Sequence, residues 1–140
     1  MKKRLPYKII SEILLKEVEN KKSTNVLEIG CGGKIYKKIF KNQNYYGIDK
    51  SNSEWINNDD KPEFICDLKD FKSSLKFEFI FSVATIYLLD KNSLKKLIEL
   101  INQLKQINGR CLIFDYNRNT VNQLGNLYNY YIEILENNFK

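Results

Sequence analysis

The sequence predicts an α/β fold, a three-layer α/β/α sandwich around a mainly parallel sheet of about five strands. Three observations lead to this expectation. Short apolar segments of strand length alternate with segments whose apolar residues recur at helical spacing. A glycine cluster follows the first strand segment directly. Several later strand segments end on an acidic residue. Such alternation places helices on both faces of a parallel sheet.

The early elements are predicted as follows. A helix over residues 6–20 begins at Pro6, a favourable first-turn residue, and a short buried strand covers residues 25–29. A second helix is expected over residues 34–41, directly after the glycines. Its inward-facing residues would be Ile35, Ile39 and Phe40.

The later elements complete the alternation. Strands are predicted over 45–49, 63–67, 77–82 and 110–115, and helices over 91–107 and 119–138. Gly109 is expected to end the helix over 91–107. In such sheets ligands bind beyond the carboxyl ends of the strands. The candidate functional residues stand there: the glycines, Asp49, Asp67, Ser82 and Asp115.

The composition is that of a globular protein, and the 140 residues fit a single domain, residues 1–140, with a core over 25–115. No apolar run approaches the roughly 18 residues of a membrane helix, so no membrane association is expected. The three cysteines, Cys31, Cys66 and Cys111, form no CxxC pair, and histidine is absent. We therefore expect no metal site and a cytoplasmic location.

The net charge of +6 raises the question of a nucleic-acid partner. Arginine, the preferred residue for planar recognition of phosphate and guanine, occurs only three times. The composition therefore disfavours nucleic acid. A weak basic face remains an alternative to a solvated helix face, at Lys34, Lys37, Lys38 and Lys41.

The strongest motif runs from Val26 to Gly33, with the sequence VLEIGCGG. Glycines between a strand and a helix let the backbone approach a ligand closely. The helix predicted after them would offer free N–H groups to that ligand. A dinucleotide fingerprint, G-x-G-x-x-G, would require glycine where Ile35 stands, which disfavours a standard NAD site.

With Glu28 two residues before Gly30, this segment resembles the first motif of class I S-adenosylmethionine-dependent methyltransferases, (D/E)-x-G-x-G-x-G. Four later segments resemble further motifs of that family, in order: 47–51, 66–68, 77–90 and 104–110. The resemblance covers residues 26–115 and implies a Rossmann-like domain of the methyltransferase type 11/25 kind. The family adds two strands after the fifth, so the resemblance also implies a chain shortened at its C-terminal end.

The resemblance implies S-adenosyl-L-methionine as the cofactor. Its implied contacts are Glu28, Gly30, Cys31, Gly32, Gly33, Asp49, Lys50, Ser51, Asp67, Leu68 and Ser82. Glu28 would meet the cofactor's amino group, Asp49 the ribose hydroxyls and Asp67 the adenine. Asp49 stands 19 residues after Gly30, close to the roughly 20 at which an acid meets a ribose.

The candidates for a general base are Tyr87, Asp90, Asp115 and Tyr116, with Tyr87 ranked first because it replaces a family histidine. Asp90 is better explained as a helix N-cap. Lys34 stands at the family's third glycine and Leu88 at a second family histidine.

Two functions remain open. The first is methyl transfer to a small-molecule acceptor, favoured by the retained acids Glu28, Asp49 and Asp67. The alternative is a shortened, non-catalytic module that binds the cofactor or a partner. An exposed sheet edge would suit a homodimer or a partner chain. Methylation of nucleic acid, suggested only by the charge, ranks last.

Overall fold

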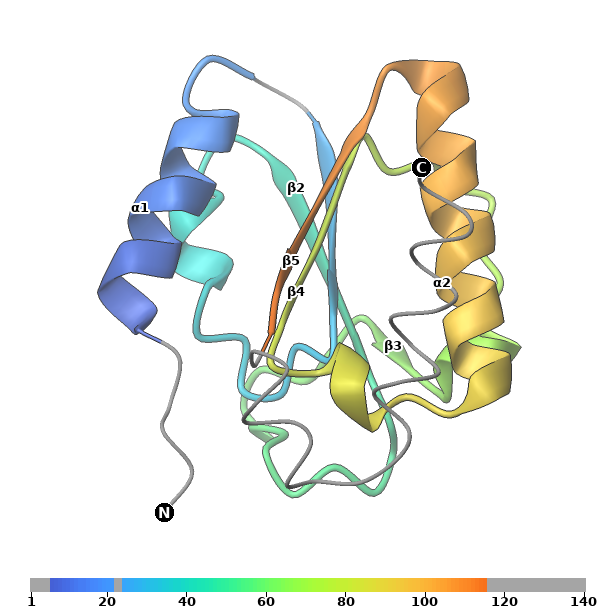
Figure 1. The fold of residues 1–140 in the computed structure, drawn as a ribbon. Helices are drawn as coiled ribbons and strands as arrows, with labels where there is room; N and C mark the ends of the chain where they lie inside the picture. Colours follow the sequence, from blue (N-terminus) through green and yellow to red (C-terminus); the bar gives the residue numbers. More distant parts are fainter. Residues whose placement is uncertain (1–5, 22–23, 116–140) are drawn as a thin grey trace.

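The computed structural model describes residues 6–21 and 24–115, which form one five-stranded sheet between helical layers (Figure 1). The strands are β1 (Asn25–Ile29), β2 (Asn44–Asp49), β3 (Phe64–Ile65), β4 (Phe79–Val83) and β5 (Arg110–Phe114). All pairings are parallel, in the order β3-β2-β1-β4-β5. The predicted fold class is therefore confirmed.

Helix α1 (Tyr7–Val18) covers one face of the sheet, and helix α2 (Lys91–Leu104) covers the other (Figure 1). Four short 3₁₀ turns complete the described elements: η1 (Lys37–Ile39), η2 (Leu68–Asp70), η3 (Ile86–Leu88) and η4 (Lys105–Ile107). Within the described residues, no helix has the length and apolarity needed to cross a membrane. The predicted helix over 119–138 and Tyr116 lie outside these residues.

Two apolar cores follow from the two-residue period of the strands. On the α1 side, Val26 and Phe81 pack with Leu14. On the α2 side, Leu27 and Ile80 belong to the cluster that holds the inner stripe of α2. That stripe comprises Leu94, Leu97, Leu100 and Leu104. Each helix is therefore held by one buried face, as its sequence period predicts.

The predicted helix over residues 34–41 is wrong, because only η1 forms there. Lys34 has a left-handed backbone, with φ of 59°, which an α-helix cannot contain. Ile35, expected to face inward, is 57% exposed, whereas Phe40 is buried. The apolar spacing was compatible with a helix, but the glycine turn extends through Lys34 and leaves room for a single 3₁₀ turn.

The helix predicted over 91–107 is α-helical only to Leu104 and continues as η4 to Ile107, and its terminating residue differs by one position from the predicted Gly109. Asn108, with φ of 55°, is the left-handed residue, and Gly109 donates from its N–H to Leu104 O at 2.8 Å. Asparagine tolerates this conformation better than most residues. Gly109 is required for another reason, since a Cβ there would lie 2.7 Å from Glu78 O.

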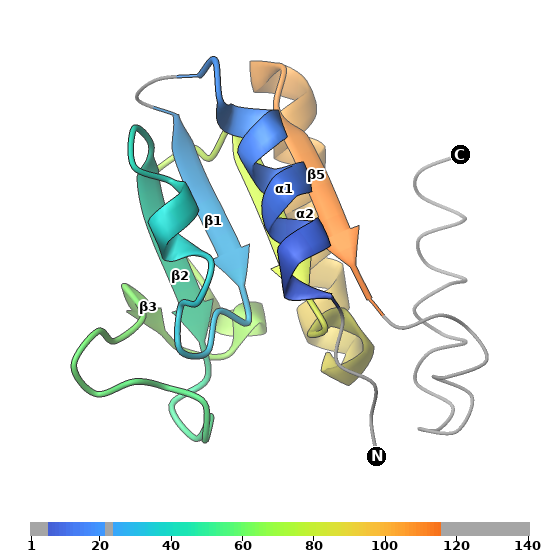
Figure 2. The same cartoon turned by 90° about the vertical axis from the view of Figure 1, so that its left-hand side faces the viewer.

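Strand order reverses between β1 and β4, because the chain builds outward from β1 to β3 and then crosses to the other side. A crevice forms at such a point, beyond the carboxyl ends of the strands. In Figure 1 these ends lie at the bottom, with the connections that follow β1, β2 and β4. β3 and β5 form opposite edges of the sheet (Figure 2).

Asp90 forms the N-cap of α2, as expected. Its Oδ1 accepts the Ser93 N–H at 2.8 Å, and this bond holds the pKa of Asp90 below its usual value. We predict that Asp90→Ala lowers the free energy of unfolding by about 1 kcal/mol, measured by urea denaturation. Asp90→Asn, which keeps the acceptor oxygen, should retain most of the stability. Equal stability of Asp90→Ala and the unchanged protein would contradict the cap.

Candidate active site

The glycine turn, residues 30–34, joins β1 to η1 and requires unusual backbone angles. Gly30 and Gly32 have φ of 71° and 50°. A Cβ on Gly30 would lie 2.2 Å from the side chain of Thr85, so no larger residue fits. The Gly30 N–H donates to Ile48 O at 2.9 Å, which ties the start of the turn to β2. The turn therefore sits between the ends of β2 and β4, at the crevice.

Asp49, the last residue of β2, contacts this turn directly. Its Oδ2 accepts the Gly32 N–H at 2.8 Å, and its Oδ1 accepts the Lys50 N–H at 2.8 Å. A carboxylate oxygen can accept more than one hydrogen bond, so both oxygens keep capacity for a ligand hydroxyl. The two features that the sequence placed together, the glycines and the acid, are in hydrogen-bond contact.

Glu28 lies on β1 with 3% exposure, and Tyr45 OH donates to its Oε1 at 2.5 Å. Burial, together with a smaller effect of the neighbouring charge of Asp49, raises the pKa of Glu28 to about 8. The Tyr45 bond and the charge of Lys34 act in the opposite direction. Glu28 is therefore mainly a neutral carboxyl at neutral pH, able to ionise when a cation comes close.

An open cleft of about 1770 Å³ runs along the glycine turn. It brings together eight of the residues predicted for the site: Glu28, Gly30, Cys31, Gly32, Gly33, Asp49, Lys50 and Tyr87. The loop between β2 and β3, residues 50–63 (the β2–β3 loop), forms part of the wall through Trp55.

Five predicted residues are not among those lining the cleft: Ser51, Asp67, Leu68, Ser82 and Asp115. Leu68 belongs to the core on the α2 side, and Ser82 is 1% exposed, with an Oγ that makes no hydrogen bond within the described residues. Asp67 directly precedes η2, and its C=O accepts the Asp70 N–H at 3.0 Å. Their roles toward a ligand stay predictions.

Tyr87, in η3, lines the cleft and is 9% exposed. Burial, followed by the charge of Asp115, raises the pKa of its phenol above the usual value. Such a phenol stays protonated near neutral pH and can donate a hydrogen bond, but it is a poor general base. Asp115 Oδ2 accepts the Tyr87 N–H at 3.1 Å, so this acid braces η3 against the end of β5.

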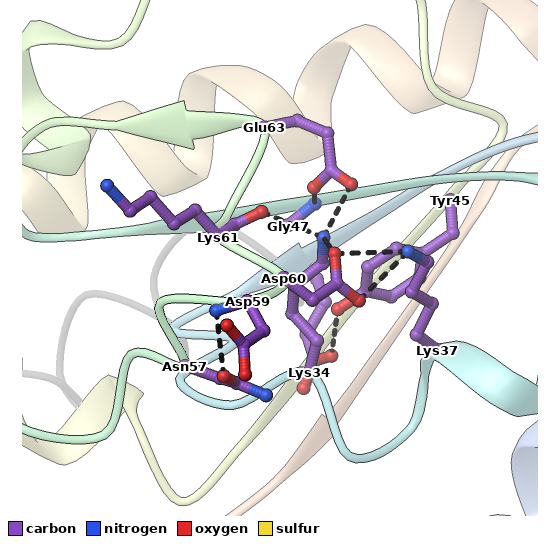
Figure 3. Close-up of polar contacts among 10 residues, drawn as sticks. Lys34, Lys37, Tyr45, Gly47, Asn57, Asp59, Asp60, Lys61 and Glu63 are labelled. Carbon is purple, nitrogen blue, oxygen red and sulfur yellow. Dashed lines mark hydrogen bonds and ion pairs between the residues drawn. The ribbon is translucent and has the colours of Figure 1, made fainter.

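The sequence did not reveal the role of Lys34, whose side chain is 1% exposed. Its Nζ donates to Asp60 Oδ1 at 2.9 Å, to Lys61 O at 2.9 Å and to Glu63 Oε1 at 2.8 Å (Figure 3). A lysine ammonium has three donors, and all three are used. Lys37 also pairs with Asp60, at 3.0 Å. The basic face considered from the sequence is therefore largely neutralised at these two lysines.

Glu63 links this lysine to the sheet. Its Oε2 accepts the Gly47 N–H at 2.8 Å, at the position where a longer β3 would pair with β2. β3 covers only Phe64–Ile65, so the strand predicted over 63–67 is too long at both ends. At its start, Glu63 contacts β2 through its side chain. The sequence signal for this ion-pair cluster was Lys34 at the end of the glycine cluster, together with the acids Asp60 and Glu63 further along the chain. The partners lie 26 to 29 residues apart, so spacing alone could not identify them.

Glu28 predicts a pH-dependent stability. Its pKa rises from 4.5 to about 8 on folding, so between these values only the folded state holds the proton. Stability must then fall as pH rises through that window, by at most about 1.4 kcal/mol per pH unit. Glu28→Gln, which cannot ionise, should raise the melting temperature more at pH 8 than at pH 5. The exposed Glu19→Gln serves as control, and parallel pH profiles for Glu28→Gln and the unchanged protein would refute the assignment.

Comparison with known proteins identifies solved structures that share this fold. No protein-family model and no curated protein matches the chain. Among solved structures, it is similar to a TehB-like SAM-dependent methyltransferase from Corynebacterium glutamicum, with a TM-score of 0.59 and 18% identity over 91% of this chain. It is also similar to a SAM-dependent methyltransferase from Aquifex aeolicus, with a TM-score of 0.53 and 21% identity over 76% of this chain.

A third similar structure is a putative methyltransferase from an antibiotic biosynthesis pathway of Anabaena variabilis, with a TM-score of 0.58 and 15% identity over 95% of this chain. The chain spans 71%, 64% and 55% of the lengths of these three proteins, in the order given. At these identities the likeness concerns the fold. The glycine turn, the acid at the end of β2 and the strand order agree with it, and the chain has the fold of class I S-adenosylmethionine-dependent methyltransferases.

Proposed function

We propose that this chain binds S-adenosylmethionine at the glycine turn and transfers its methyl group to a small-molecule acceptor. The observation that carries the proposal is the contact between Asp49 and the Gly32 N–H, at 2.8 Å, inside an open cleft. The cleft lies where strand order reverses, the usual ligand position in open α/β sheets. The fold of the similar methyltransferases supports the choice of cofactor.

The chain's own residues fit such a ligand. The Asp49 carboxylate has acceptor capacity left for the two ribose hydroxyls. The Gly33 N–H, which makes no hydrogen bond within the described residues, is a donor for the methionine carboxylate. Glu28 would meet the cofactor's amino group, and a cation beside it would lower its raised pKa and favour the carboxylate form.

When bound, the cofactor supplies an electrophilic methyl group on a sulfonium. The protein's task is then to hold an acceptor atom in line with that methyl, which can contribute up to about 7–11 kcal/mol. Tyr87 lines the cleft, and burial keeps its phenol protonated near neutral pH, so this residue is the candidate to contact the acceptor. No group of three metal-ligating side chains occurs within the described residues, and the proposed transfer requires none.

Cofactor binding is tested by calorimetric titration with S-adenosylmethionine and with NAD. We expect binding of the first, and a loss of affinity of about 10-fold or more in Asp49→Ala, because hydrogen bonds to a charged group are lost. Asp49→Asn, which keeps one acceptor oxygen for the turn, should fall between. Asp59→Asn is the matched control, since Asp59 is an exposed acid of the β2–β3 loop. Unchanged affinity in Asp49→Ala would remove Asp49 from the site.

Methyl transfer is tested separately, by S-adenosylhomocysteine formation when fractions of a small-metabolite pool are added to protein and cofactor. The proposal predicts formation with at least one fraction, and its loss in Asp49→Ala. Cofactor binding without product from any fraction would instead favour the shortened, non-catalytic module.

A further inference from the structure

Trp55 is the single tryptophan of the chain and lies in the β2–β3 loop. It is 68% exposed, although it lines the same cleft as the glycine turn and Asp49. Tryptophan carries a large apolar surface, and leaving its ring in water forgoes the stabilisation that burial would give. A ring exposed in this way beside a cleft is available to cover a ligand.

The backbone geometry places Trp55 against the turn itself. A Cβ on Gly32 would lie 3.0 Å from Trp55 Cβ, and a Cβ on Gly33 would lie 3.3 Å from Trp55 O. Asp49 bonds to the N–H of the same Gly32. Trp55 and the acid proposed for the ribose therefore contact the same glycine, which places the tryptophan next to the ribose position of the proposed site.

The β2–β3 loop is anchored at both ends. Asp49 fixes its start through the Gly32 and Lys50 N–H groups. Lys34 fixes its end through Asp60, Lys61 O and Glu63 (Figure 3). A buried ammonium is stable only when its charge and donors are satisfied, so these partners must stay close to Lys34. Lys34 itself belongs to the glycine turn. The turn and the far end of the loop are thereby held as one unit, with Trp55 between the two anchors.

We propose that the Trp55 ring covers the adenosine part of the bound cofactor, and that Lys34 is the positioning residue that holds the Trp55 loop against the glycine turn. The inference rests on the proposed function, because it requires the cofactor to bind there. Adenine has a flat π face, and aromatic side chains stack on such faces without requiring hydrogen bonds. All three N–H donors of the Lys34 ammonium are bound within the protein, so Lys34 acts on the ligand only through the loop that it fixes.

The first test compares Trp55→Ala and Trp55→Phe with the unchanged protein by calorimetric titration of S-adenosylmethionine and S-adenosylhomocysteine. Loss of base stacking should weaken both ligands about 10-fold or more in Trp55→Ala, and less in Trp55→Phe, which keeps an aromatic ring. In the unchanged protein the tryptophan emission should change saturably with either ligand. Because Trp55 is exposed, neither variant is expected to unfold the chain.

The second test uses Lys34→Met, with Lys37→Met as the matched control, since Lys37 shares Asp60 but is a surface cation. We expect Lys34→Met to weaken the ligands as Trp55→Ala does, and to add little when combined with it. Lys37→Met should leave affinity within about 2-fold, as a surface ion pair contributes little. Independent, additive losses from Lys34→Met and Trp55→Ala would overturn the positioning role.

The outcomes separate this inference from the proposed function. No binding of either ligand to the unchanged protein overturns both. Binding with unaltered affinity in Trp55→Ala overturns only the role of Trp55. A loss confined to S-adenosylmethionine would place the ring at the sulfonium, the group that S-adenosylhomocysteine lacks, and would overturn the adenosine assignment.

Discussion

The hydrogen bond from the Gly32 N–H to Asp49 is the contact on which the site depends. Gly30 and Gly32 adopt left-handed backbone angles readily because they lack a Cβ, and the end of β2 fixes their position through Asp49 and Ile48 O. At Lys34 the same conformation carries a strain cost. The same contact leaves the acid facing the cleft. The hydrogen bond that stabilises the turn therefore also positions the acid of the candidate site.

Two buried ionisable side chains of opposite type, Glu28 and Lys34, line the cleft and differ in their charge state. Glu28 sits among apolar and aromatic neighbours with one short hydrogen bond, and burial keeps it mainly neutral. Lys34, equally buried, stays charged because Asp60 and Glu63 surround it. The Glu28 carboxyl can ionise when a cationic ligand binds, whereas the Lys34 ammonium is held by ion pairs within the protein. This contrast suits a cofactor that brings its own ammonium group.

Much of this arrangement could be predicted from the sequence, because apolar period and the order of glycines and acids are local signals. The strands and the pairing of the glycine turn with Asp49 follow from them. The helix expected over 34–41 does not form because Lys34 has a left-handed backbone, and the side-chain partners of Lys34, Asp60 and Glu63, lie far along the chain. Likewise, Ser82 stands near a strand end as expected, yet no sequence signal reveals that it is buried and does not line the cleft.

The most direct test of the account is amide NMR of the protein titrated with S-adenosylhomocysteine. Gly109 lies before the amino end of β5, opposite the strand ends that carry the turn, and provides an internal reference. The account predicts saturable shifts of the Gly30, Gly32 and Gly33 amides, with Gly109 unmoved. Shifts absent from the turn, or equally large at Gly109, would contradict it.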